Sequence, residues 1–501
     1  MARGRLWEGL VWFDAALADL GAQHPGVAPA VRARALADRA VLAIRVDAAD
    51  SLEQAQQALA IARELDDPAL LARTLTACGF TAGAGYHVEV ARAYFAEAIG
   101  LARALDDRWR LSQILAVQAV GAHTAGDPSA MRAAGEEGRD LADAIGDRLN
   151  SRVCRFCLGS AQMFSGDLAG ATTQFGEVAA EAQAAHDEVW SVLSRGGQGM
   201  ALAYRGEAAA ARTAAEAALE GGAELGGRYT TFGHAVVGFA ALAAGDGAAV
   251  HEARKATNEH ITVVSGSTGL FWRIWNVQAT LADGDLAAAR RWADETVSIT
   301  TGWYSTMALT LRARAAIAAG EPEQAERDAH DALTCAAELK AYLLIPDTLE
   351  CLGTLNGEGD SHREAARLFA AAAAIRLRIG AVRFKIYDAG YEASVAALRD
   401  AMGEKNFDAA WAEGAALSTE EAIAYAQRGR GQRKRPTTGW ESLTPTERDV
   451  VRLASDGLGN KDIAVRLFIS PRTVQTHLTH VYTKLGLTSR VQLVQEAARH
   501  P

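Results

Sequence analysis

The stretch MFSGDLAGATTQFGEVAAEAQAA, residues 163–185, reads as the end of one helix, a turn and an amphipathic second helix. Gly166 suits the left-handed conformation that ends a helix, and Asp167 suits the cap of the next one. Beyond the turn, apolar residues recur at i, i+4, i+7 and i+8: Ala171, Phe175, Val178 and Ala179. One helical pair cannot bury such a stripe alone, so we expect it to stack on neighbouring pairs.

The same glycine-acid pair recurs along much of the chain at intervals of 36 to 40 residues, as Gly126-Asp127, Gly166-Asp167, Gly206-Glu207, Gly245-Asp246, Gly284-Asp285, Gly320-Glu321 and Gly359-Asp360. This period predicts an array of helical hairpins. We expect weaker copies at Gly4, near Asp47 and at Gly85, so that the array fills residues 1 to about 415. The segments GDLAAARRWADETV and GEPEQAERDAHDAL resemble the second half of a tetratricopeptide-like (TPR-like) repeat, although these units are longer than the usual 34 residues.

Composition agrees with an all-helical chain. Aromatic residues make up 7% and there are only 10 prolines, which favours helices over strands. No run of 18 uncharged apolar residues occurs and the N-terminal segment does not resemble a secretory signal, so we expect a cytoplasmic protein with no membrane contact. Five scattered cysteines do not form a disulfide framework, and we expect reduced thiols.

Charge is distributed unevenly along the chain, whose net charge is −10. Residues 428–501 contain 13 Lys and Arg against 6 Asp and Glu, whereas the rest contains 38 against 55. The tail therefore has a net charge of +7 and the remainder has a net charge of −17. A basic tail on an acidic body predicts a polyanionic partner for the tail alone.

Two short segments of the body invite a chemical interpretation. Cys154 and Cys157 have the spacing of half a metal or redox site, but no second ligand pair stands at a suitable distance, and two small buried residues are the favoured interpretation. Residues 265–269, SGSTG, resemble a phosphate loop only in composition, because the chain has no Gly-Lys-Ser or Gly-Lys-Thr triplet. We expect a loop between repeats there.

A group of aromatic residues has two interpretations. These residues either line a ligand groove or fill gaps in an alanine-rich stack, and we favour the second: Phe271, Trp272, Trp275, Trp292, Trp303 and Tyr304. The sequence shows no Ser-His-Asp, Cys-His or paired-carboxylate pattern. We therefore expect no enzyme activity, no cofactor and no metal.

Residues 428–440 are rich in Arg, Lys, Gly and Pro, which predicts a flexible basic linker. Residues 441–501 then contain the starts and stops of four helices. Thr444, Pro445 and Glu447 form a capping box, which makes Glu447 a cap and not a catalytic acid. The first helix should bury Val450, Val451, Leu453 and Ala454 and end at Gly457, and the second should bury Ile463, Ala464 and Leu467. We expect Asn460 to cap the second helix, and Ser470 to cap the third, which opens at Pro471.

The third helix should have two different faces. Helical spacing predicts a buried stripe of Val474, Leu478, Val481 and Leu485. The opposite face should carry Arg472, Thr476, Thr479 and Thr483, flanked by Gln475 and His480. No acidic residue lies between Ser470 and Gln495, so phosphates would meet no repulsion there. Such a face suits the major groove of DNA.

Residues 443–490, LTPTERDVVRLASDGLGNKDIAVRLFISPRTVQTHLTHVYTKLGLTSR, closely resemble the LuxR-type helix-turn-helix family. The resemblance implies a four-helix DNA-binding domain whose third helix reads bases and whose fourth helix helps to form a dimer. It places Gln475, Thr476 and Thr479 at base edges, and it gives phosphate or orienting contacts to Lys461, Ser470, Arg472, Thr473, His477 and Lys484. The family often has Lys or Arg at the positions of Gln475 and Thr479, and Gln475 fits an adenine contact instead. For His477 and Lys484 a purely structural role remains open.

We thus predict an all-α protein: a TPR-like helical-hairpin solenoid in residues 1–427 that senses or binds a partner, followed by a small four-helix LuxR-type helix-turn-helix domain. The expected function is transcription regulation through double-stranded DNA, as a homodimer, with an unknown protein or small-molecule effector on the array. The layout resembles the C-terminal half of large LuxR-type regulators without their nucleotide-binding domain. The alternative is a helical-repeat interaction scaffold whose C-terminal domain is vestigial or docks protein.

Overall fold

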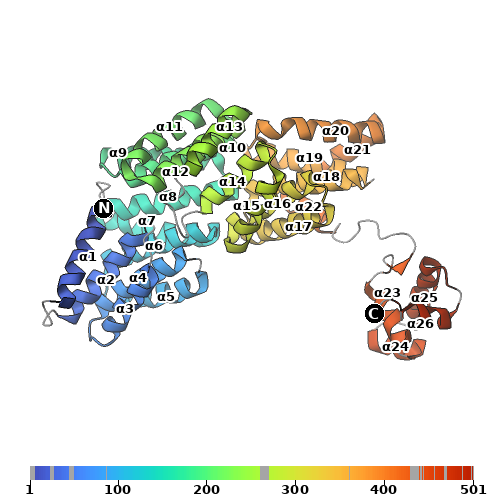
Figure 1. The fold of residues 1–501 in the computed structure, drawn as a ribbon, viewed down its shortest axis with the longest axis horizontal. Helices are drawn as coiled ribbons and strands as arrows, with labels where there is room; N and C mark the ends of the chain where they lie inside the picture. Colours follow the sequence, from blue (N-terminus) through green and yellow to red (C-terminus); the bar gives the residue numbers. More distant parts are fainter. Residues whose placement is uncertain are drawn as a thin grey trace. The chain divides into compact units, whose positions relative to one another are not determined.

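A computed structural model of the protein describes residues 6–22, 28–44, 50–85, 87–259, 270–359, 361–428, 439–440, 443, 445–455, 457–467, 471–487, 489–497 and 499. These residues form helices and turns, with no strand among them, so the predicted all-α fold is confirmed. The chain divides into two compact units, Met1–Ala426 and Gln427–Pro501, here called the body and the C-terminal unit (Figure 1).

The body consists of consecutive antiparallel helices, and short turns join those whose connections the structure describes (Figure 1). Its α-helices are α1 (Leu6–Ala22), α2 (Pro29–Ile44), α3 (Ser51–Arg63), α4 (Pro68–Ala84), α5 (Val88–Ala104), α6 (Arg108–Ala125), α7 (Pro128–Ile145), α8 (Arg148–Ser165), α9 (Leu168–Ala184), α10 (Glu188–Tyr204), α11 (Ala208–Leu225), α12 (Gly227–Ala244), α13 (Gly247–Glu259), α14 (Leu270–Ala282), α15 (Leu286–Ile299), α16 (Gly302–Ala318), α17 (Pro322–Leu339), α18 (Ile345–Glu358), α19 (His362–Ile379), α20 (Asp388–Met402), α21 (Glu404–Ala415) and α22 (Thr419–Arg428). Two 3-10 turns, η3 (Tyr342–Leu344) and η4 (Lys385–Tyr387), interrupt the series.

The glycine-acid pairs form the turns that the period predicts. Six of the seven glycines have φ between 68° and 91°, and Gly359, at −89°, is the exception. At Gly126 the amide of the following Asp127 donates to the Ala122 carbonyl, which closes the end of α6. The aspartates at 127, 167, 246 and 285 accept a backbone hydrogen bond from the next helix, whereas the longer Glu207 and Glu321 side chains make no such cap.

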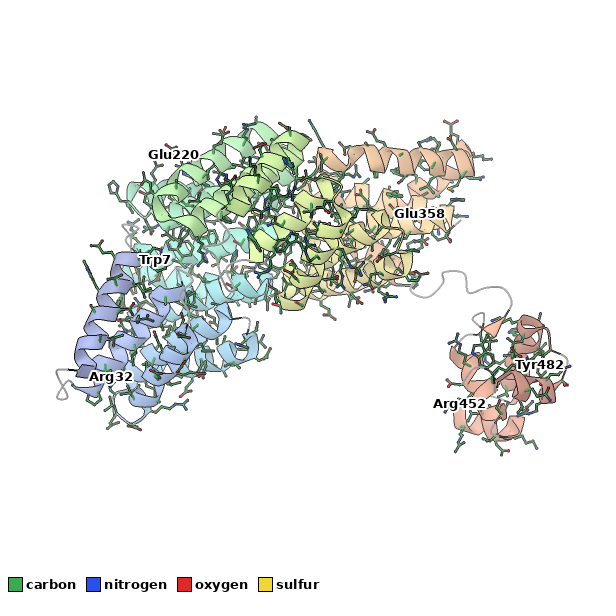
Figure 2. All side chains as sticks on the ribbon, viewed as in Figure 1. Trp7, Arg32, Glu220, Glu358, Arg452 and Tyr482 are labelled. Carbon is green, nitrogen blue, oxygen red and sulfur yellow. The ribbon has the colours of Figure 1, made fainter. Side chains whose placement is uncertain are left out.

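The hairpins stack into two layers. From α2 to α18 each even-numbered helix contacts the next even-numbered helix, and the odd-numbered helices pack over them. Small residues allow this close approach: a Cβ at Gly238 would lie 2.0 Å from the Trp275 ring, and one at Gly138 would lie 2.7 Å from Cys154 Sγ. Glu220 on α11 lies on the outside of the stack (Figure 2).

Distant repeats also touch, so the stack curls on itself. The Trp303 amide at the start of α16 donates to the Gly126 carbonyl at the end of α6, at 2.8 Å. The Val382 amide donates to the Tyr204 carbonyl at 2.7 Å, and Arg228 Nη1 donates to the Ile44 carbonyl at 2.9 Å. These bonds join hairpins more than 170 residues apart and enclose space between the even-numbered helices.

The members of the aromatic group lie in two different surroundings. Trp275 and Trp303 are fully buried in the body core, and the Trp303 ring stacks on Phe164 with centroids 4.0 Å apart. Phe271, Trp272 and Tyr304 instead line a cavity. Gap filling therefore explains only part of the group.

Cys154 and Cys157 are both buried in the same core. Burial raises the pKa of the Cys154 thiol to about 12 and that of Cys157 well above its usual range. Thiolates, the form that binds metals or reacts, are therefore disfavoured, which supports the interpretation as buried small residues.

Several sequence predictions fall on residues outside the described ranges: Gly4, Asp47, residues 265–269, Asp360, most of the proposed linker, Thr444 and Ser470. At Gly85, another expected weak copy, α4 gives way to α5. Within the described ranges, no helix combines the length and apolarity needed to cross a bilayer.

Candidate nucleic-acid interface

The C-terminal unit is built on α23 (Pro445–Ser455), α24 (Asn460–Leu467), α25 (Pro471–Leu485) and α26 (Arg490–Ala497). As predicted, α23 opens at Pro445, α25 opens at Pro471, and Gly457 has a positive φ of 85° after α23. A single core joins the four helices, with Leu467 and Leu485 at its edge: Leu443, Val450, Val451, Leu453, Ala454, Ile463, Ala464, Val474, Leu478, Val481 and Leu493. Every core residue predicted for these helices lies in or against this cluster.

The third helix, α25, has the two faces that its spacing predicts. Val474, Leu478 and Val481 are at most 2% exposed, because they pack against α23 and α24. Thr479 and Thr483 are exposed, and so is Gln475 at the flank. Helix, turn, helix and an outward polar face are the arrangement that places a helix against base edges.

Gln475 is held in place by a chain of hydrogen bonds. Asn460 Nδ2 donates to Gln475 Oε1 at 2.9 Å, and Arg490 Nη1 donates to Asn460 Oδ1 at 3.2 Å. Because Gln475 Oε1 already accepts from Asn460, the amide nitrogen of Gln475 is the end of this side chain that remains available to donate a hydrogen bond. The network therefore fixes which end of this amide serves as donor.

The prediction that Asn460 caps the second helix was wrong. Asn460 is the first residue of α24, and the Gly459 carbonyl accepts from the Ile463 amide in the cap position. The Asn460 side chain turns instead toward Gln475 and Arg490. The cap is displaced by one residue because glycine can occupy it while the amide side chain satisfies two partners.

Arg490 belongs to the candidate site through Asn460, and the sequence interpretation did not single it out. Its guanidinium donates to the Leu458 carbonyl and lies 3.5 Å from the Ala454 carbonyl, beyond the C-terminal end of α23. A positive charge there is favourable for the dipole of α23, but Arg490 also opens α26, where a cation is disfavoured. An arginine in the first turn of a helix is unusual, and this position could have indicated from the sequence that Arg490 interacts with groups outside α26.

Two threonines of α25, Thr479 and Thr483, bond back to their own helix. Thr479 Oγ1 donates to the Gln475 carbonyl at 2.9 Å, and Thr483 Oγ1 donates to the Thr479 carbonyl at 3.0 Å. Such bonds fix the hydroxyl proton and leave the oxygen lone pairs directed outward as acceptors. An exposed Thr479 is thus suited to accept from a base amino group or to contact a thymine methyl.

The candidate phosphate contacts differ in their surroundings. Lys461 is exposed in the first turn of α24. Lys484 Nζ lies 2.7 Å from Glu447 Oε2, and Glu447 is only 3% exposed, so this lysine neutralises a buried carboxylate. His477 is half-buried, and exposed His480 has Nδ1 at 4.0 Å from Glu447 Oε1. Arg472, Thr473 and Thr476 lie in α25, but their side chains are outside the described set.

Arg452 projects from α23 and Tyr482 lies on α25 (Figure 2). Arg452 is exposed and pairs with Asp449 one turn earlier, at 3.2 Å. Exposed ion pairs of this kind contribute little to stability, at most about 1 kcal/mol.

Known proteins resemble the chain at two levels. Over 99% of its length it is 56% identical to proteins named as HTH-type transcriptional regulators in Mycobacterium bovis and in Mycobacterium tuberculosis strain H37Rv, and the match covers 56% of each relative. The chain thus spans little more than half the length of these relatives. Over 63 residues, 13% of the chain, it is 43% identical to the oxygen regulatory protein NreC of Staphylococcus aureus, of which the match covers 29%. Residues 441–497 match the family described as bacterial regulatory proteins, luxR family, and therefore form a LuxR-type helix-turn-helix domain.

Proposed function

We propose that the protein is a transcription regulator whose C-terminal unit binds double-stranded DNA with α25 in the major groove, while the body responds to an effector. The observation that carries the proposal is the outward face of α25, where Gln475 and Thr479 are exposed opposite a fully buried stripe. The names of the mycobacterial relatives support a regulatory role over a catalytic one.

In this mechanism, different residues provide affinity and sequence preference. Lys461, exposed beside the turn, neutralises a phosphate, and the basic excess of residues 428–501 adds to this attraction. Gln475 reads adenine through its oriented amide, and Thr479 and Thr476 complete the base contacts. Arg472, Ser470, Thr473 and His477 are proposed to position the helix on the backbone, and two copies are proposed to bind paired half-sites.

The first test is a selection of bound duplexes from a random pool with the full-length chain, followed by affinities for single-base variants of the selected site. Gln475→Ala should lose preference at one base position, by about 1–3 kcal/mol. Gln495→Ala, an exposed glutamine on α26, is the matched control and should keep the preference. Equal weakening on all sequences by Gln475→Ala would reduce that residue to a backbone contact.

The second test is the salt dependence of the same affinities. The logarithm of the association constant should fall steeply with the logarithm of salt concentration, and Lys461→Ala should reduce the slope by about 1. A flat profile with no selected sequence would contradict DNA recognition. That result would favour the interaction scaffold.

A further inference from the structure

The body encloses a cavity of about 200 Å³ between its even-numbered helices. Residues of α2, α4, α6, α8, α10, α12, α14 and α16 line it, so the hairpins of more than half the body meet at this one place. An apolar cavity of about 150 Å³ is already large enough to bind benzene. The space is therefore sufficient for a small ring compound.

The walls of this cavity are mainly aromatic. Phe80, Phe156, Trp190 and Phe271 contribute rings from four different helices. His123 joins them on α6, and burial lowers its pKa to about 4, so that its imidazole is neutral at physiological pH. The wall also includes a few polar groups, Arg228 among them, but its aromatic rings favour a flat, mainly apolar ligand.

Among the residues that the structure describes, two hydrogen-bond donors in the wall have no partner. Thr231, 3% exposed, and Trp272, 9% exposed, both line the cavity. Thr231 Oγ1 and Trp272 Nε1 are buried without a hydrogen bond. A buried polar atom without a hydrogen bond is unfavourable, and a bound acceptor would relieve that cost.

We propose that this cavity binds a one-ring or two-ring aromatic molecule that carries a hydrogen-bond acceptor, such as a carbonyl, which accepts from Thr231 and Trp272. The ring packs among the aromatic side chains, and the acceptor satisfies the two donors. The binding of this molecule to the cavity does not depend on the proposed function. Its role as the effector of a transcription regulator does. Binding to the body is measured without DNA, so failure of either proposal is visible separately.

Acetophenone and ethylbenzene are suitable probes, because they share a shape and only acetophenone has an acceptor. We expect calorimetric titration of the full-length chain with acetophenone to show saturable binding with a dissociation constant of about 1 mM or lower. Thr231→Val removes the hydroxyl at nearly constant volume and should weaken acetophenone binding about three- to tenfold, with no effect on ethylbenzene. Thr300→Val is the matched control, because Thr300 Oγ1 is also buried and unpartnered but lies outside the cavity.

Trp272→Phe gives an independent measurement if Thr231→Val fails to fold, because it removes the indole N–H and keeps a ring. It should weaken acetophenone binding and spare ethylbenzene. Absence of saturable acetophenone binding by the wild-type chain overturns the proposal. The proposal is equally overturned if Thr300→Val weakens binding as much as Thr231→Val, or if folded Trp272→Phe binds both probes as the wild type does.

Discussion

The body and the C-terminal unit are both made of amphipathic helices, yet the polar side chains at their two candidate sites differ in how they are hydrogen-bonded. In the C-terminal unit, Asn460 links Gln475 to Arg490, so each side chain is held by the next. In the body, Thr231 and Trp272 keep donors without partners beside a cavity. A chain of completed hydrogen bonds fixes the orientation of the Gln475 side chain. Two donors without acceptors instead favour the binding of a ligand that supplies an acceptor.

Packing differs between the units for a related reason. The body brings helices together through alanine and glycine, with Gly238 directly against Trp275, and large rings then fill the space that remains. The C-terminal unit has one small core, mainly of leucine, valine and isoleucine. A long stack that curls on itself can therefore enclose a cavity between repeats that are distant in sequence.

Loss of a core side chain should separate the two units most clearly. Leu478 is 2% exposed in the centre of the C-terminal core. Leu478→Ala should lower the free energy of unfolding of that unit by about 2–5 kcal/mol and leave the body unchanged. Hydrogen exchange of the full-length chain, resolved by peptide, measures both units together. Thr483→Ala, at an exposed position of the same helix, should change neither, and equal loss in both units would refute their independence.

Periodicity made much of this fold predictable. The glycine-acid spacing located the repeat turns, and the i, i+4, i+7 stripe of α25 located its buried face, because each depends only on neighbours along one helix. The cavity depends on contacts such as Trp303 to Gly126, which join repeats far apart in sequence. No local pattern contains that information.

For the candidate site too, the sequence predicted features that depend on one helix but not those that depend on contacts between helices. Exposure of Gln475 and Thr479 followed from helical spacing. The orientation of Gln475 did not, because Asn460 and Arg490 reach it from two other helices. Lys484 shows the same limit: its charge suggested a phosphate, but the pairing with buried Glu447 depends on how α23 crosses α25.

Lys484→Met tests that pairing. Removing the ammonium takes the Lys484 cation away from the buried Glu447 carboxylate, which should cost the C-terminal unit about 2–3 kcal/mol, somewhat less than for a fully buried pair. Chemical unfolding measures the loss. The salt dependence of DNA binding should keep its slope in this variant, whereas Lys461→Met should reduce the slope by about 1. A reduced slope with unchanged stability would make Lys484 a phosphate contact.

His123 should make the body sensitive to acid in a way that the C-terminal unit does not share. Its ring is surrounded by Phe156, Phe164 and Tyr304, and burial lowers its pKa from 6.5 to about 4. The unfolded chain therefore binds this proton before the folded chain does, so stability present above pH 6.5 is lost as the pH falls toward 4.

Between about pH 7 and pH 5 this loss should amount to about 2 kcal/mol. Unfolding of the body at both pH values in wild type and His123→Gln measures it, and the variant should lose that part of the pH dependence. His87→Gln, at an exposed position, is the control and should behave as the wild type. The same pH dependence in His123→Gln would show that other groups titrate.

The smallest expected effect concerns the hydrogen bond from Asn460 that orients Gln475. Asn460→Ala removes the donor to Gln475 Oε1, so the amide can turn and present either end to DNA. Preference at the base read by Gln475 should fall by about 1 kcal/mol, or about fivefold, with little change in average affinity. The comparison is decisive in a Gln475→Ala background, where Asn460→Ala should have no further effect on preference because the two residues act as one unit. Additive losses would mean that Asn460 contacts DNA by itself, and that the hydrogen bond between the two side chains has no part in recognition.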